Sequence, residues 1–208
     1  MYLWVFQGNL GEGKTSAMSI LAHYYRSKMR NKIELFSNYG LLGSHELKHY
    51  SDFYEVARCH GSIVAIDEAQ TSLDSRLFAK GNNIYLTQFM FYLRKLGCSW
   101  FLSSPSIANL DSRVRSLTNI LVDCHKSPAG FTYHIYDYQA QNYGPFGKLL
   151  RRKFLPMERA KMIFATGVYD TYKILRSIPF PGNEREFDNF LKHIIEIHEE
   201  AILKIRAV

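Results

Sequence analysis

Cysteine is scarce in this chain of 208 residues, and long apolar runs are missing. The three cysteines, Cys59, Cys98 and Cys124, have neither CxxC spacing nor an accompanying pair of histidines. This pattern argues against a zinc site and against a disulfide framework. We expect Cys98 and Cys124 to act as small apolar residues.

Segments that direct a protein to membranes are also missing. No run reaches the roughly 18 apolar residues that a transmembrane helix needs. No basic leader followed by an apolar stretch and a cleavage site opens the chain. We therefore expect a soluble, intracellular protein without a transmembrane segment.

Internal repeats and low-complexity tracts are absent as well. Hydrophobic residues make up 47% of the chain, which excludes disorder as an interpretation. The length suits one domain with a sizeable core. A formal net charge of +7 would favour work against a polyanion such as nucleic acid, although many basic proteins bind nothing anionic.

A glycine-rich segment near the start carries the clearest functional signal. Residues 8–15 read GNLGEGKT, which fits the phosphate-binding P-loop pattern GxxxxGK[ST]. The apolar run 2–6 before it predicts a strand, and the apolar spacing of 14–30 predicts a helix. Phosphate then meets inward-turned backbone N–H groups and a helix N-terminus. A chance match in a glycine-rich turn is the alternative.

The P-loop pattern gives roles to individual residues. Lys14 is expected to reach the β- and γ-phosphates, and the Thr15 hydroxyl to take one position on Mg²⁺. The predicted nucleotide-binding residues are Gly8, Asn9, Leu10, Gly11, Glu12, Gly13, Lys14, Thr15 and Ser16.

Two adjacent acids close a second apolar run. Residues 62–66 read SIVAI and predict a strand buried on both faces of a parallel sheet, and Asp67 and Glu68 follow. Asp67 is expected to hold Mg²⁺ opposite Thr15, and Glu68 to act as general base for the attacking water. The pair argues for hydrolysis rather than nucleotide binding alone. Two solvated acids at a strand end are the alternative.

The order of elements indicates a three-layer α/β fold with a mainly parallel central sheet. Further strands are expected at 33–38, 99–104 and 120–123, and helices at 51–58, 84–96 and 107–117. Residues 131–138 alternate and predict an antiparallel hairpin strand paired with 119–124. Because ligands bind at the carboxyl ends of parallel strands, Gly8, Asp67 and Ser103 are expected on one edge.

We predict two regions. Residues 1–140 form the P-loop ATPase core, and residues 141–208 form an extension packed on it. The extension contains a basic loop patch at 148–153 and an amphipathic helix at 188–206.

Further candidate residues lie around these motifs. Ser103 and Ser104 end the strand 99–104 and are candidate sensors of the γ-phosphate, or ordinary turn residues before Pro105. Gln70 and Gln88 are weaker candidates.

Two arginines follow the sensor strand. Arg113 and Arg115 are candidate arginine fingers, which a ring ATPase subunit supplies to its neighbour. The alternative is a solvated helix face with Asp111 and Arg115 paired. Two basic segments are either DNA-backbone contacts or solvated faces. They are residues 75–83, with Arg76 and Lys80, and the bases Lys148, Arg151, Arg152 and Lys153.

Taken together, GNLGEGKT, VAIDEAQ, a helix ending RKLG, and WFLSSPSIANLDSRVRSL resemble the FtsK/HerA superfamily of P-loop motors. The likeness is to its Zot-like and viral genome-packaging branch and covers about residues 1–125. It implies a RecA-like ASCE fold and an oligomeric ring, hexamer or pentamer, that hydrolyses ATP with Mg²⁺ between subunits and pulls double-stranded DNA.

Residue by residue, the resemblance places Lys14 and Thr15 in the nucleotide site, Asp67 on magnesium and Glu68 as base. It makes Arg113 or Arg115 the finger. Two features depart from the family: Ser-Ser stands where many members have glutamine at the sensor, and a membrane anchor is missing. The first departure leaves the sensor unassigned, and the second favours soluble packaging over extrusion.

The leading hypothesis is an ATP-driven DNA translocase, the packaging ATPase of a virus or phage. It would work in the host cytoplasm or on the virion, with a capsid-vertex or membrane-vertex protein as a further partner. A Zot-like assembly or secretion ATPase acting on protein or on an extruded virion is the alternative, and a nucleotide-regulated or kinase-like module is a third. ATP is the expected nucleotide, because no NKxD-like guanine motif is present.

Overall fold

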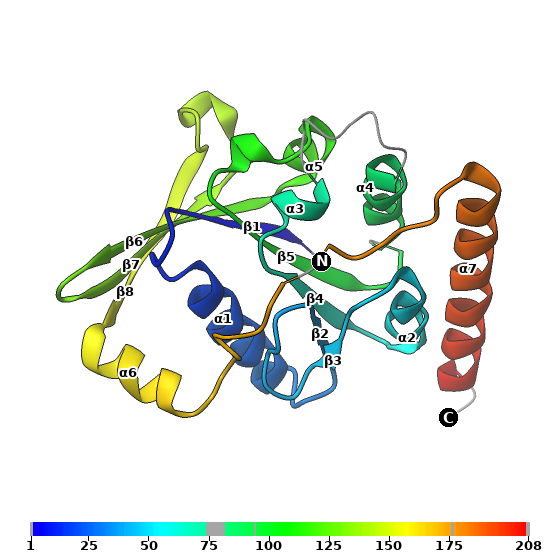
Figure 1. Ribbon diagram of the computed structural model, residues 1–208, viewed down its shortest axis with the longest axis horizontal. Coiled ribbons are helices and arrows are strands. Elements are labelled where there is room, and N and C mark those ends of the chain that lie inside the picture. Colours follow the sequence, from blue (N-terminus) through cyan, green and yellow to red (C-terminus); the bar gives the residue numbers. More distant parts are fainter. Residues whose placement is uncertain (1, 74–81, 94, 176, 207–208) are drawn as a thin grey trace.

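Strands from the whole length of the chain form one sheet. The structure, a computed structural model, describes residues 2–73, 82–93, 95–175 and 177–206 (Figure 1). Within these ranges the sheet has eight strands in the order β3-β2-β4-β5-β1-β6-β7-β8. The strands are β1 (Leu3–Gln7), β2 (Glu34–Ser37), β3 (His45–Glu46), β4 (Ser62–Ile66), β5 (Cys98–Ser104), β6 (Ile120–Ser127), β7 (Gly130–Asp137) and β8 (Lys148–Pro156).

The first six strands are parallel and the last two are antiparallel. β1 lies between β5 and β6, and β4 lies between β2 and β5, all in parallel pairs. β7 pairs with β6 in an antiparallel hairpin, as the sequence predicts, and β8 then pairs with β7. The predicted α/β fold with a mainly parallel sheet and an antiparallel C-terminal addition is confirmed.

Helices cover both faces of the sheet and make the predicted three layers (Figure 1). One face carries α1 and α6, and the other carries α2, α4, α5 and α7. The helices are α1 (Lys14–Lys28), α2 (Phe53–Arg58), α3 (Gln70–Leu73), α4 (Asn82–Leu93), α5 (Ser112–Leu117), α6 (Met157–Ala165) and α7 (Glu184–Arg206), with short 3₁₀ turns at Tyr50–Asp52, Ile107–Asn109 and Gln141–Tyr143.

The position of β4 inside the sheet explains why its residues are mainly apolar and do not alternate between apolar and polar. All five of its residues are buried. Ile63 and Ala65 pack in the core under α1, and Val64 and Ile66 pack in the core on the opposite face. A strand covered by helices on both sides needs apolar side chains in both directions.

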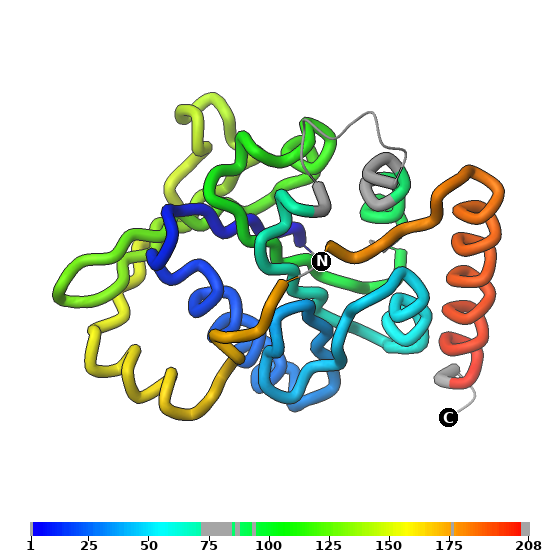
Figure 2. Tube along the Cα trace, in the orientation of Figure 1, coloured from blue at the N-terminus to red at the C-terminus, as the bar shows by residue number. Residues whose placement is uncertain are grey.

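The helix predicted near the C-terminus is present as α7, which stands at the right of the chain trace in Figure 2, beyond α2. Phe190 on α7 is almost fully buried, and its ring lies 4.9 Å from that of Phe89 and 5.2 Å from that of Tyr50, between ring centroids. His198 Nδ1 lies 2.9 Å from the Ala57 carbonyl oxygen on α2. The amphipathic face of α7 therefore packs on the core.

The sequence reasoning missed two elements in the C-terminal third. Residues 148–153, taken as a basic loop patch, belong to strand β8, and α6 follows directly. Every side chain of β8 except Leu155 is exposed, so the strand lacks the alternation of buried and polar residues that marks a half-buried strand. Its regularity comes from pairing with β7.

Candidate active site

The P-loop leaves the carboxyl end of β1 and runs into α1. Lys14, the first residue of α1, is only 6% exposed, and its Nζ donates hydrogen bonds to the carbonyl oxygens of Gly8 (2.8 Å) and Asn9 (3.0 Å). The Glu12 carboxylate accepts a hydrogen bond from the Asn9 N–H. The loop therefore holds its lysine inward by its own carbonyl groups.

Gly13 adopts a backbone conformation with φ of +85° at the N-terminus of α1. A Cβ atom there would lie 2.6 Å from Phe131 Cδ1 and 3.2 Å from Tyr133 Oη. Gly11 has a similar φ of +79°, but a Cβ atom there would meet nothing within 4 Å. The loop thus packs tightly on β7 at Gly13 and is open at Gly11. Leu10, which precedes Gly11, is 95% exposed.

Asp67 follows β4 and is the hub of a hydrogen-bond network. Its Oδ2 accepts from Thr15 Oγ1 at 2.9 Å, and its Oδ1 accepts from Ser103 Oγ. Its backbone is held by Asn38, which accepts from the Asp67 N–H at 2.8 Å and donates to the Asp67 carbonyl at 3.1 Å. Burial raises the pKa of Asp67, and the hydrogen bonds from Ser103 and Thr15 act in the opposite direction.

Glu68 has a positive φ of 52°, which is uncommon for a residue with a side chain. Its N–H donates to Ser103 Oγ at 3.1 Å, and its Oε2 accepts from the Gln70 side-chain amide. Ser103 thus contacts both acids of the pair. Glu68 also lines a cavity of about 250 Å³ together with Lys14 and Thr15.

The structure brings seven of the predicted residues to the lining of this cavity. They are Leu10, Gly11, Gly13, Lys14, Thr15, Ser16 and Glu68, and Asp67 contacts Thr15 at its edge. Ser104 is turned elsewhere, since its Oγ donates to the Ser106 carbonyl at 2.8 Å. Gln88 is exposed on α4. The sensor roles of the two serines stay a prediction.

The two predicted arginine fingers lie on α5, on the sheet face opposite α1 (Figure 1). Neither Arg113 nor Arg115 lines the cavity. The Asp111 carboxylate accepts a hydrogen bond from the Arg113 N–H at 2.8 Å and caps α5. An Asp111–Arg115 ion pair is not among those formed by the described residues.

The predicted basic segments have different outcomes. Lys148, Arg151, Arg152 and Lys153 are exposed on β8. Arg76 and Lys80 lie outside the described residues. Over the parts of the chain that are described, no helix combines the length and apolarity required to cross a bilayer.

Several residues of the site were not predicted. Asn38 directly follows β2. A polar residue at the carboxyl end of a parallel strand is a pattern from which this residue could have been predicted. The remaining cavity-lining residues come from the C-terminal half and have no local motif: Lys126, Phe131, Phe164 and Tyr169. Tyr169 is held by a 3.0 Å hydrogen bond between its hydroxyl and that of Ser16.

Comparison with solved structures identifies the fold as that of P-loop NTPases. The N-terminal domain of zonular occludens toxin from Neisseria meningitidis aligns with 90% of this chain and 97% of that domain, at 18% identity and a TM-score of 0.51. The genome packaging NTPase B204 from Sulfolobus turreted icosahedral virus 2, in complex with sulfate, aligns with 75% of this chain and 97% of its own, at 13% identity and a TM-score of 0.51. At these identities the likeness is one of fold.

Comparison with models of protein families finds no match, and comparison with curated protein sequences finds none either. The likeness to the Zot domain and to B204 thus shows the P-loop NTPase fold of this chain.

Proposed function

We propose that this protein is an ATP-hydrolysing translocase of double-stranded DNA that works as an oligomeric ring in viral genome packaging. The observation that carries the proposal is the contact between Thr15 Oγ1 and Asp67 Oδ2 at 2.9 Å, beside Lys14 and Glu68. These are the four side chains that phosphoryl transfer to water requires at a P-loop.

The donor groups at this contact suit Mg²⁺. A threonine hydroxyl and an aspartate carboxylate are oxygen ligands, which hard divalent cations prefer. Both oxygens face one another beside the P-loop, so Thr15 and Asp67 would hold the ion. When bound, Mg²⁺ neutralises charge on the β- and γ-phosphates.

The chain's own residues divide the remaining work. Lys14 would exchange the carbonyl oxygens of Gly8 and Asn9 for phosphate oxygens, since its ammonium group is already directed into the loop. Glu68 would accept the proton of the attacking water. The hydrogen bonds from Gln70 to the Glu68 carboxylate and from the Glu68 N–H to Ser103 would fix that carboxylate in position.

The ring in this proposal is argued from the position of α5, and the DNA substrate from the positive charge of the chain. Arg113 and Arg115 do not line the cavity of their own chain, which suits arginines that act on the nucleotide of a neighbouring copy. The exposed bases of β8 and the net charge of +7 would attract DNA phosphates. Proteins of the same fold include one described as a genome packaging NTPase.

The test is phosphate release by the purified full chain with ATP and Mg²⁺, with and without duplex DNA. We expect DNA to stimulate release, and Glu68→Gln to abolish it while ATP binding persists. Glu158→Gln, at an exposed position of α6, is the matched control and should hydrolyse normally. Sedimentation with an ATP analogue and DNA should detect a ring. Hydrolysis that ignores DNA, or that survives in Glu68→Gln, would contradict the proposal.

A second candidate is an assembly or secretion ATPase that acts on protein or on an extruded virion. It is favoured by the extent of the likeness to the Zot domain, which covers 90% of the chain against 75% for B204. This candidate requires a membrane-embedded partner and no affinity for duplex DNA at low salt. Such a result in a binding assay would replace the translocase proposal.

A further inference from the structure

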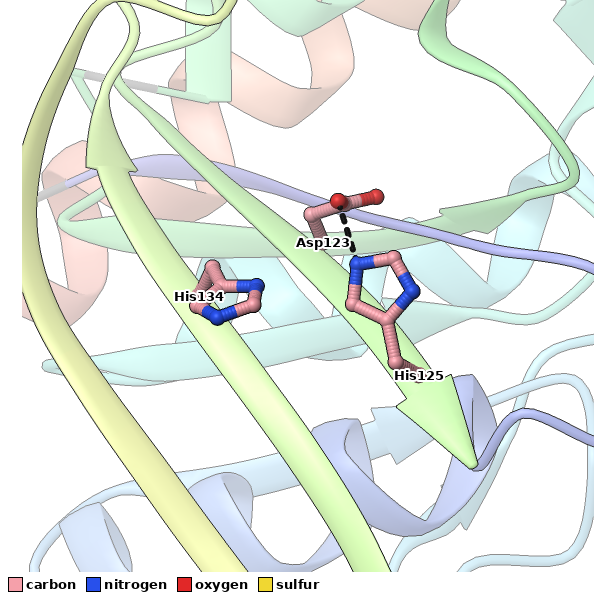
Figure 3. Close-up of side chains that lie close together, drawn as sticks. All are labelled: Asp123, His125 and His134. Carbon is pink, nitrogen blue, oxygen red and sulfur yellow. Dashed lines mark hydrogen bonds and ion pairs between the residues drawn. The ribbon is translucent and has the colours of Figure 1, made fainter. Parts of the chain in front are cut away.

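Three side chains with metal-binding atoms meet on the face of β6 and β7 opposite α1 (Figure 3). Asp123 and His134 are directly opposed in the antiparallel register, and His125 lies two residues beyond Asp123 on the same face. One ligand atom from each of the three lies within 4.8 Å of the others. The hairpin register therefore gathers two imidazoles and one carboxylate at one place.

The carboxylate of this cluster is fixed from both sides. Asp123 Oδ2 lies 2.7 Å from His125 Nε2, and Asp123 Oδ1 accepts a hydrogen bond from the Gln7 side-chain amide at 3.1 Å. The Gln7 Oε1 accepts from the Ile107 N–H at 3.1 Å, which determines which end of the amide faces Asp123. Hydrogen-bonded partners of this kind orient ligands in metal sites.

The second imidazole has a nitrogen without a partner. Nε2 of His134 is buried and makes no hydrogen bond to any of the described residues. The Arg152 guanidinium belongs to the residue opposite His134 on β8. The ring centroids of His134 and His125 are 5.3 Å apart.

We propose that Asp123, His125 and His134 bind one first-row transition-metal dication, with Zn²⁺ as the ion to test. Two imidazole nitrogens and one carboxylate oxygen are a donor set that such ions use, with the remaining positions left to water. The donors differ from the oxygen pair of Thr15 and Asp67, so the two sites should select different ions.

The location gives the proposed ion a structural consequence. Gln7 immediately precedes Gly8 of the P-loop, and it contacts Asp123 directly. An ion at the cluster would join β6 to β7 and hold the strand end from which the P-loop departs. The proposal concerns metal binding alone and does not depend on nucleotide hydrolysis.

Calorimetric titration of the full chain with Zn²⁺, without nucleotide, tests the site. We expect one ion per chain, and affinity at least about 10-fold weaker in His125→Ala, His134→Ala and Asp123→Asn. Millimolar Mg²⁺ should not displace the ion. Thermal unfolding of each of these three variants in chelator establishes that it is folded, and Zn²⁺ should raise the unfolding temperature of the wild type more than that of any of the three.

Two further variants separate this site from other zinc binding. His60→Ala removes an exposed histidine next to Cys59 and should bind Zn²⁺ as the wild type does. Arg152→Gln should tighten binding several-fold, because it removes a positive charge opposite His134. Loss of binding in His60→Ala, or wild-type affinity in folded His134→Ala, would overturn the proposal.

Discussion

The tight packing of Gly13 against β7 makes a quantitative prediction about the P-loop. Alanine at Gly11 or Gly13 has to adopt a positive φ, which costs about 1–2 kcal/mol. Reduced entropy of the unfolded chain returns about 0.4–1 kcal/mol at either position. Only at Gly13 does the new methyl group also meet an aromatic ring, at 2.6 Å from Phe131 Cδ1.

Overpacking of this kind adds about 1–3 kcal/mol. Gly13→Ala should therefore be less stable than Gly11→Ala by that amount. For a protein of this size the difference corresponds to an unfolding temperature lower by about 2–12 °C. Urea unfolding followed by far-ultraviolet circular dichroism, with no nucleotide present, measures both variants against the wild type.

A double-mutant cycle isolates the contact. In a Phe131→Ala background the two closest contacts of the new methyl group are gone and only the Tyr133 hydroxyl, 3.2 Å away, remains, so the cost of Gly13→Ala should fall most of the way to that of Gly11→Ala. Equal destabilisation by the two glycine variants in the wild-type background would refute the reasoning. Retention of the full Gly13→Ala cost after Phe131→Ala would also refute it.

Three other variants test the core and the acid pair. Asp67→Asn should stabilise the metal-free protein at neutral pH by about 1 kcal/mol while abolishing hydrolysis. Because burial raises the pKa of Asp67 in the folded protein, the stability of the wild type should fall as the pH rises above the range where an unfolded aspartate titrates. Thermal unfolding at several pH values should show this slope in the wild type and not in the variant. Phe190→Ala should cost about 3–5 kcal/mol in urea unfolding, since its ring is buried between Phe89 and Tyr50; a cost below 1 kcal/mol would show that α7 is not docked. Ser103→Ala should slow hydrolysis more than Ser104→Ala in steady-state assays, because only the first serine contacts both acids; the reverse order would contradict this assignment.

The parts of the site that local patterns determine were predictable from sequence. The P-loop and the acid pair each lie at the end of an apolar strand, and parallel strands bring their carboxyl ends to one edge. That reasoning placed Gly8, Asp67 and Ser103 on one edge, and in the structure Asp67 contacts both Thr15 and Ser103 there. It did not extend to Asn38, although the same rule applies to the residue following β2.

Contacts that depend on register or on distant packing were not predictable in the same way. The pairing of 131–138 with 119–124 was anticipated, but the cluster of Asp123 and His134 follows only from the residue-by-residue register. The contact between Gly13 and Phe131 joins segments more than 100 residues apart, and no local pattern records it. β8 was missed because solvent on both of its faces removes the alternation that identifies strands.

The position of β8 at the end of the sheet has a consequence for the behaviour of concentrated protein. An edge strand offers unpaired backbone N–H and C=O groups to any other extended chain, and pairing at such edges leads to aggregation. Arg151, Arg152 and Lys153 on β8 would face the same positive charges on a second molecule whose β8 lay alongside. Electrostatic repulsion therefore keeps the sheet from growing between molecules, and concentrated salt, which screens it, weakens that protection.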